Sequence, residues 1–239
     1  MSLFWILLIS VVIVKMSVFF TTIYLHRALT HRGLELHPVV ALFMHLHLSL
    51  FTGIKPREWI AVHRKHHHFS DKEGDPHSPL IYGMWTVLFG NALLYRREAA
   101  NPKTIRKYTP DYREDILDKL PVQNWSALFG LGIFMLMFGW LAGLIAFVSQ
   151  GAVYILLNSS INSICHVIGY RNFENQATNL QLIALITGGE GLHNNHHESP
   201  TSARFSMRRG EIDPSWPLIR LLEILRLAKV NRVPMARAA

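Results

Sequence analysis

Three long runs of apolar residues constrain the fold of this 239-residue chain more than any other feature. They cover residues 1–25, 36–54 and 127–157, while much of the remaining chain is polar and rich in histidine. A soluble domain interleaves apolar with polar positions, whereas an unbroken run of about 20 apolar residues is typical of a membrane-spanning helix. The sequence therefore predicts an all-α integral membrane protein.

Charge and cysteine content exclude several classes of protein. The formal net charge of +8 suits an anionic membrane surface, so we expect a membrane and no nucleic acid as the partner of the basic residues. The single cysteine, Cys165, excludes a disulfide framework, a thiolate zinc site and an iron–sulfur cluster carried by this chain. The sequence has neither a glycine-rich dinucleotide motif after a strand pattern nor a haem attachment motif. Any electrons that this protein uses must therefore come from another protein.

Nine of the fourteen histidines fall into spaced groups. These groups are His26 with His31, then His63, His66 and His67, then His166, and finally His193, His196 and His197. Each trio has the spacing i, i+3, i+4, which lies on one face of an α-helix, so that three imidazoles can converge on one metal ion. His26 and His31 are five residues apart, roughly 140° around an α-helix. Either the helix unwinds after His26, or these two residues serve different metals.

Nine imidazoles are too many for one metal ion. A tetrahedral zinc takes about four ligands, and calcium and magnesium prefer oxygen. Imidazole suits iron, copper, nickel and zinc, and two six-coordinate ions accommodate nine nitrogens with positions left for water or O2. The pattern predicts a two-metal site and leaves the metal open. His37, His45, His47 and His68 lie outside this spacing, and we expect them to be ordinary polar residues.

The position of the histidines predicts the topology, because a shared site requires every group to lie on one face of the membrane. Residues 1–25 then span once, and Arg27 and Arg32 mark the exit as cytoplasmic. Residues 36–54 carry three histidines, which are costly in lipid, so we expect a helix at the interface or buried against other helices. Residues 125–143 and 145–165 form a hairpin of two spans that turns near residues 139–140. The chain is thus one domain, residues 1–239, with three spans and a cytoplasmic helical cap of residues 26–121 and 166–239.

Two further helices are expected in the cap. Pro56 suits a helix start and Glu58 its first turn, so the first trio is predicted to lie on a helix that begins at Pro56. Residues 216–230 have apolar residues at helical spacing with basic residues among them, which is typical of a helix on a membrane surface.

Five motifs resemble those of the membrane fatty acyl desaturases of the stearoyl-CoA type. They are His-Arg-Ala-Leu-Thr-His at 26–31, Glu-Trp-Ile-Ala-Val-His-Arg-Lys-His-His at 58–67, Asp-Pro-His at 75–77, Asn-Ser-Ile-Cys-His at 162–166 and Gly-Glu-Gly-Leu-His-Asn-Asn-His-His at 189–197. The match runs in order from about residue 1 to residue 205 with similar gaps, which makes the joint pattern specific.

This resemblance implies a di-iron enzyme that uses O2 to insert a cis double bond into a saturated acyl chain. The two irons would be held by His26, His31, His63, His66, His67, His166, His193, His196 and His197, with Asn162 reaching one iron through a water. Asp75, His77 and Glu190 are expected to lie behind the ligands, where a carboxylate that accepts a ring N–H fixes the tautomer of a histidine. The electrons would come from an external ferredoxin-like or cytochrome donor.

The chain departs from the animal members of this family at two places. It begins at the equivalent of their second span, and Ala61 and Val62 stand where they carry an Arg-Asp pair that contacts the CoA headgroup. An acyl group on CoA, on a phospholipid or on a carrier protein is therefore open as the substrate. A related membrane hydroxylase or oxygenase and a non-enzymatic metal- or lipid-binding membrane protein are the alternative functions. We expect the protein in a bacterial inner membrane, with the metal site on the cytoplasmic face.

Overall fold

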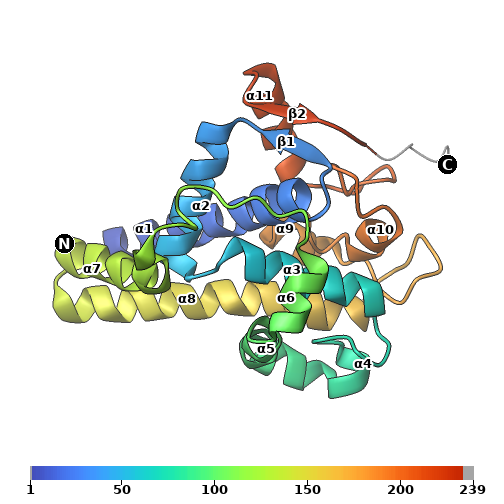
Figure 1. The fold of residues 1–239 in the computed structure, drawn as a ribbon, viewed down its shortest axis with the longest axis horizontal. Coiled ribbons are helices and arrows are strands. Elements are labelled where there is room, and N and C mark those ends of the chain that lie inside the picture. Colours follow the sequence, from blue (N-terminus) through green and yellow to red (C-terminus); the bar gives the residue numbers. More distant parts are fainter. Residues whose placement is uncertain (1, 234–239) are drawn as a thin grey trace.

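The computed structural model describes residues 2–233, apart from the side chain of Val122. Nearly all elements are helices, as predicted (Figure 1). In chain order they are α1 (Leu3–Phe20), the π-helix η1 (Thr21–Thr30), β1 (Leu34–Leu36), α2 (Pro38–Thr52), α3 (Pro56–Phe69), α4 (Pro79–Tyr82), α5 (Met84–Ala99), α6 (Pro102–Tyr108), the 3-10 helix η2 (Pro121–Trp125), α7 (Ser126–Phe138), α8 (Trp140–Ser163), the 3-10 helix η3 (Ile164–His166), α9 (Gln181–Ile186), α10 (His193–Glu198), α11 (Ser215–Ile224) and β2 (Ala228–Val230).

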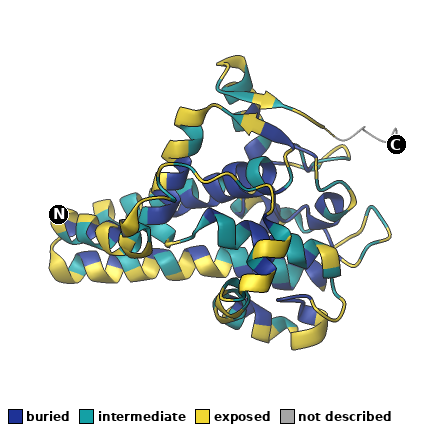
Figure 2. Cartoon of the chain, in the orientation of Figure 1, coloured by how far each residue is buried: buried dark blue, intermediate teal, exposed yellow. Residues whose placement is uncertain are grey.

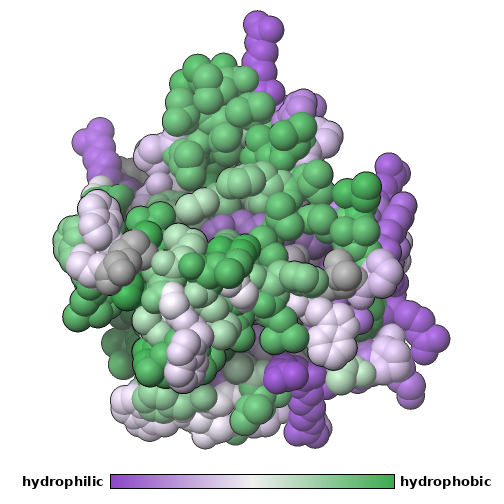
Figure 3. All heavy atoms as spheres, turned by 90° about the vertical axis from the view of Figure 1, so that its left-hand side faces the viewer, coloured by the Kyte–Doolittle hydropathy of each residue, from purple (hydrophilic) through white to green (hydrophobic). Residues whose placement is uncertain are grey.

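One end of the molecule is built from apolar helices. Here α1 and α7 pack against α8, and the N-terminus lies at the same end as the turn between α7 and α8 (Figure 1). Leu3–Thr30 and Trp140–His166 are each long and apolar enough to cross a membrane. Side chains at this end are largely exposed (Figure 2), and the face that they form is mainly hydrophobic (Figure 3). An exposed apolar surface of this kind is what a lipid-facing bundle requires, and it makes the chain compatible with an integral membrane protein.

The hairpin turn between α7 and α8 is confirmed at Gly139, which has a φ of 85°. This left-handed region favours glycine because a Cβ atom would clash there. The first arm is shorter than expected, because α7 has only 13 residues, about 20 Å at the rise of an α-helix. A bilayer core is roughly 30 Å thick, so α7 alone is not long enough for the span predicted at residues 125–143.

Small residues allow α7 to pack closely against its neighbours. A Cβ atom added at Gly130 would lie 1.9 Å from the carbonyl oxygen of Leu50 on α2, and one at Gly143 would lie 2.5 Å from the Cα of Met135. Helices in membranes rely on such close approaches, since lipid supplies no hydrophobic driving force between them.

We expect Gly130→Ala to destabilise the protein, because the added methyl group overlaps the α2 backbone. Overpacking of this kind costs roughly 1–3 kcal/mol, which is measurable as a lower Tm of the detergent-purified protein. Gly132→Ala is the matched control, since a Cβ at Gly132 meets nothing within 4 Å. Equal Tm values for the two variants would contradict this account of the α2–α7 contact.

Residues 36–54 form one helix over most of their length, as predicted. Leu36 ends β1, and α2 begins at Pro38 and stops where Gly53 adopts a φ of 68°. The next helix, α3, begins at Pro56 as predicted and is bent by 88° from α2. The two helices have the composition of a membrane span only when they are taken together, as a broken span or a re-entrant segment.

The other end of the molecule carries the polar residues and a small sheet. β1 pairs antiparallel with β2, with Leu34 opposite Val230. The prediction of one helix over residues 216–230 was therefore wrong in its last third. α11 ends at Ile224, Arg226 turns the chain with a φ of 58°, and the residues after it exchange helical hydrogen bonds for strand hydrogen bonds.

Candidate metal centre

The π-helix η1 brings His26 and His31 together. The N–H of His31 donates to the carbonyl oxygen of His26 at 3.1 Å, and the two ring centroids are 4.9 Å apart. A π-helix bonds residue i to residue i+5, so residues five apart lie one turn apart on one face. Both expected explanations are therefore wrong. The helix widens into a π-helix instead of unwinding, and the two histidines belong to one group instead of serving different metals.

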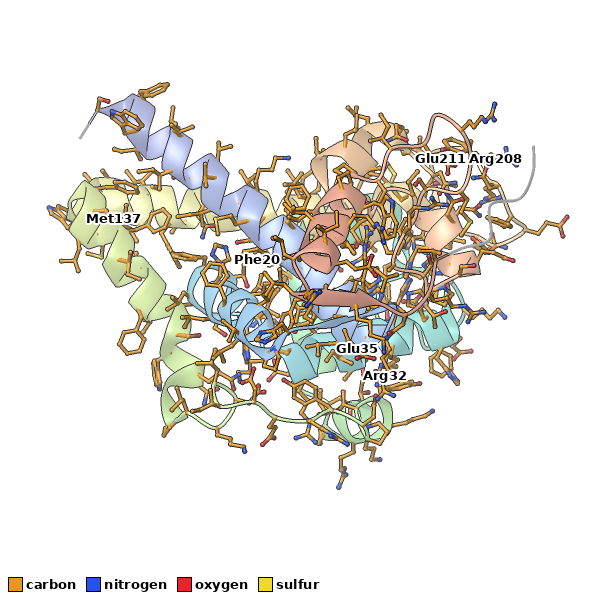
Figure 4. All side chains as sticks on the ribbon, turned by 90° about the horizontal axis from the view of Figure 1, so that it is seen from above. Phe20, Arg32, Glu35, Met137, Arg208 and Glu211 are labelled. Carbon is orange, nitrogen blue, oxygen red and sulfur yellow. The ribbon has the colours of Figure 1, made fainter. Side chains whose placement is uncertain are left out.

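The nine predicted histidines gather into two groups whose ring nitrogens lie close enough to hold a metal ion. The five-histidine group consists of His26, His31, His63, His67 and His196, and the four-histidine group consists of His66, His166, His193 and His197. Nitrogen-bearing side chains are concentrated in the half of the molecule away from Met137 (Figure 4).

Each trio is divided between the two groups, contrary to the expectation that one trio would converge on one metal. Helix α3 sends His63 and His67 to one group and His66 to the other. Residues i and i+4 are about 40° apart around a helix, whereas i+3 and i+4 are about 100° apart. Because His66 and His67 point in such different directions, the helix lies between the groups and serves both, and α10 does the same.

Within the five-histidine group, the Nε2 atoms face one another. Successive Nε2···Nε2 distances from His26 through His196, His67 and His63 to His31 are 3.0, 2.9, 3.0 and 3.1 Å. Two imidazole nitrogens that bind one ion at about 2.1 Å and at right angles lie about 3.0 Å apart, whereas a tetrahedral angle gives about 3.4 Å. The spacing fits a metal with right-angled ligands better than a tetrahedral zinc.

The Nε2 atoms of the four-histidine group are spaced in the same way. The Nε2 atom of His193 lies 3.0 Å from that of His166 and 3.1 Å from that of His197. The Nε2 atom of His66 is buried and has no hydrogen-bond partner among the described residues. A buried, unpaired ring nitrogen is costly unless something binds it, and a metal ion meets that need.

Electrostatics keep these imidazoles in the form that binds metals. Burial, with the charge of neighbouring imidazoles, lowers the pKa of His31, His193, His196 and His197 well below the ordinary histidine value. Neutral imidazole offers a lone pair to a metal, whereas the protonated ring offers none.

Three carboxylates accept the ring N–H on the far side of a histidine. Nδ1 of His26 donates to Glu190 at 2.7 Å, and Nδ1 of His66 donates to Asp75 at 2.9 Å. Such a bond orients the ring and leaves Nε2 free for a metal. Burial alone would raise the pKa of Asp75, but the hydrogen bond and charge of His66 hold it below its usual range.

The third carboxylate is Asp71, which the sequence analysis missed. Nδ1 of His166 donates to Asp71 at 2.7 Å, and the hydroxyl of Ser78 donates to its other oxygen at 2.6 Å. The only sequence signal is its place four residues before Asp75 on the loop after α3. The backbone N–H of Asp71 donates to Asp75 at 2.9 Å, so the two carboxylates are held in one turn.

The ring of His77 lies beside a histidine of the four-histidine group. Both of its nitrogens are buried without a hydrogen-bond partner among residues 2–233, and its ring packs 4.8 Å from that of His66. Its backbone N–H donates to Asp75 at 3.0 Å. His77 therefore contacts His66 through packing, and it also lines the cavity described below.

The histidines expected to be ordinary lie outside the two groups. The His37 ring accepts a hydrogen bond from the N–H of Val39 at the start of α2, and His47 bonds to Ser17 at 2.9 Å. His45 bonds to Asp115 at 2.6 Å. With Asp115 and Asp118 it forms a separate set of residues of the types that bind metals.

A cavity of about 630 Å³ lies beside both groups. Ligand pockets are typically about 300–1,000 Å³. His26 and His63 line it from the five-histidine group and His193 from the four-histidine group. From there the cavity extends along α8 past Tyr154 to Ala127 at the start of α7. Residues of both histidine groups thus open onto a space between apolar helices.

Comparison with known proteins supports the resemblance seen in the motifs. The family model described as fatty acid desaturase matches residues 2–214. The chain is 32% identical over 221 residues to icosanoyl-CoA 5-desaturase of Limnanthes douglasii, covering 89% of this chain and 61% of that protein. It is 31% identical over 226 residues to delta-9 acyl-lipid desaturase 2 of Arabidopsis thaliana, covering 89% and 70%. It is also 31% identical over 216 residues to sn-1 stearoyl-lipid 9-desaturase of Anabaena variabilis, covering 87% and 76%. With its motifs and this match over most of its length, the chain belongs to the fatty acid desaturase family of oxidoreductases.

Proposed function

We propose that this protein uses O2 to place a cis double bond in a saturated fatty acyl chain. The observation that carries the proposal is the single cavity that touches both histidine groups and continues between apolar helices. Relatives named as acyl-CoA and acyl-lipid desaturases support a fatty acyl substrate. Side chains alone do not remove hydrogen from unactivated methylenes, so the oxidant must come from bound metals.

We infer two irons, one at each histidine group. Imidazole suits iron, and iron activates O2 when supplied with electrons. Asn162 lines the cavity and precedes His166 of the four-histidine group by four residues, which supports it as a further ligand through a water. One turnover converts the saturated chain, O2, two electrons and two protons into the alkene and two waters. An external ferredoxin-like or cytochrome donor supplies the electrons.

The protein's own residues hold and shield the reacting chain. The ring of Trp59 stacks on His63 with centroids 4.8 Å apart, and both line the cavity. Val62, 1% exposed, adds an apolar wall. Such walls place the methylenes against the metals and keep bulk water out. Glu190, Asp75 and Asp71 keep the imidazoles in one tautomer.

The geometry favours an acyl group that arrives on a membrane lipid. Ile155 on α8 lines the cavity and is 44% exposed, so the cavity reaches a helix that is long and apolar enough to cross a membrane. Ala61 and Val62 are buried and apolar, and offer nothing to a CoA headgroup. Arg96 also lines the cavity, is exposed and has no ion pair within the described part of the chain, so we propose it as the partner of a lipid phosphate. Acyl-CoA and a carrier-bound chain are the competing outcomes of a substrate assay.

We place the histidine groups on the cytoplasmic face of a bacterial inner membrane. In this arrangement the polar cap lies on one side of the membrane, where α1 and the α7–α8 hairpin end. Lys15 is the only lysine or arginine in residues 1–26 and 121–170, while the other 23 lie in the remaining segments, and basic residues favour the cytoplasm. Arg27 does not contribute to this bias, because it is buried. Lys15 satisfies its ammonium by donating to the carbonyl oxygen of Ile186 at 3.1 Å.

The proposed function is tested by expressing the gene in a host and analysing derivatised fatty acids by gas chromatography with mass spectrometry. We expect new monounsaturated chains that are absent without the gene. Hydroxylated chains would instead indicate the related oxygenase. The host's fatty acids could instead stay unchanged, with no product formed by the purified, iron-loaded protein in the presence of a reductant. That result would favour the alternative of a non-enzymatic metal- or lipid-binding protein.

A further inference from the structure

Arg27, directly after His26, is the largest fully buried side chain among the described residues. Its guanidinium meets Asp213, whose side chain is also 0% exposed. The pair is bidentate, with Nη1 donating to Oδ2 at 2.8 Å and Nη2 donating to Oδ1 at 3.0 Å. A buried charge is tolerated only when it is paired and its other hydrogen bonds are satisfied. This pair joins η1 to the chain that follows the last histidine motif.

The other donors of Arg27 are also used. Nη1 donates to the carbonyl oxygen of Ala203 at 2.8 Å, and Nη2 to that of Gly188 at 3.1 Å. Nε donates to the hydroxyl oxygen of Thr22 at 3.2 Å. With the two bonds to Asp213, all five N–H groups of the guanidinium have acceptors. The orientation of the Arg27 head is therefore fully determined.

Thr22 connects this head to the five-histidine group. Because arginine only donates, the Thr22 oxygen acts as acceptor toward Nε, and the single hydroxyl hydrogen is left for another partner. That partner is Oε1 of Glu190, to which the Thr22 hydroxyl donates. The same Oε1 accepts Nδ1–H of His26 at 2.7 Å. One directed series of hydrogen bonds thus runs from Arg27 through Thr22 and Glu190 to His26.

We propose that the Arg27–Asp213 pair is a positioning device for the five-histidine group, acting through Thr22 on Glu190 and so on His26. The Arg27 side chain has N–H donors and no acceptor, so the direction of each bond in the series is constant. Glu190 is thereby held as an acceptor toward His26, which keeps Nε2 of that ring directed at the metal. The inference rests on the proposed function only in requiring that this group bind a metal ion.

The test removes the connecting hydroxyl and keeps the ion pair. Thr22→Val has nearly the same shape but neither accepts from Arg27 nor donates to Glu190, and Thr22→Ser restores both bonds. We expect Thr22→Val to lower the affinity for Fe²⁺ at one of the two sites by about 10–100-fold. This is the usual cost of losing the hydrogen-bond partner of a metal ligand. Affinity is measured anaerobically on the full-length protein in detergent, by competition with a chromophoric chelator. The absorption spectrum of the Co²⁺-loaded protein reports any change of ligand geometry.

Asp213→Asn gives a second variant, and Glu98→Gln is its control. Glu98 pairs with Lys65 of α3 at 2.8 Å, and neither residue belongs to a set that could hold a metal ion. We expect Asp213→Asn to weaken Fe²⁺ binding at the same site as Thr22→Val, and Glu98→Gln to bind both ions as the unaltered protein does. If Asp213→Asn fails to fold, the two Thr22 variants decide.

The outcomes separate this inference from the proposed function. An unaltered protein that binds no Fe²⁺ would overturn the proposed function itself. If it binds two ions and folded Thr22→Val binds both equally tightly, the positioning role is wrong. It is also wrong if Thr22→Ser binds Fe²⁺ as weakly as Thr22→Val, or if Glu98→Gln binds it as weakly as Asp213→Asn.

Discussion

His63→Ala is expected to abolish desaturation and to release the metal of the five-histidine group. Nε2 of His63 lies 3.1 Å from that of His31 and 3.0 Å from that of His67, so it faces the same point as the other ring nitrogens of the set. Losing the direct ligand should reduce activity by more than the roughly 100-fold that loss of a partner behind a ligand costs. Iron per protein and the monounsaturated fatty acids of expressing cells measure the two effects.

His68→Ala is the matched control for this variant. His68 lies on the same helix, is exposed, and belongs to neither histidine group. We expect its iron content and product yield to equal those of the unaltered protein. If folded His63→Ala kept two irons and full product yield, the assignment of the five-histidine group as a metal site would be wrong.

Asp71→Asn is expected to lower the metal affinity of the four-histidine group by about 10–100-fold. The amide has nearly the shape of the carboxylate, but it is neutral and can present N–H instead of oxygen to Nδ1 of His166. That ring then loses its charged acceptor at 2.7 Å and, with it, a fixed tautomer. Competition with a chelator under anaerobic conditions measures the affinity, and the ion of the five-histidine group serves as an internal reference.

Glu98→Gln is again the control for the loss of a carboxylate. Glu98 pairs with Lys65 and accepts the hydroxyl of Thr104. No bond from a histidine to Glu98 is found within residues 2–233. The role assigned to Asp71 would be refuted by equal iron affinities in folded Asp71→Asn and in the unaltered protein.

Local features of the chain were predictable from the sequence. The helix that begins at Pro56, the turn at Gly139 and the long apolar helices all follow from short-range rules, namely the fixed φ of proline, the freedom of glycine and the length of apolar runs. The histidine spacing likewise identified the nine residues that the structure brings together.

Features that depend on distant partners were not predictable. Asp71 has no distinguishing neighbours along the chain, and its contact with His166 crosses 95 positions. The strand over Ala228–Val230 exists because Leu34–Leu36 lies beside it. An isolated segment with helical spacing carries no information about such a partner.

The sequence by itself determined which imidazoles can meet, because helical spacing places them on common faces and the apolar runs hold those faces at one end of the molecule. Only the tertiary structure decided how they are shared: five in one group and four in the other, with each trio divided between them. The physical reason is that the rotation of α3 and α10 relative to η1 depends on packing between segments far apart in the chain. The buried pair of Arg27 with Asp213 is part of that packing, and no local pattern indicates it.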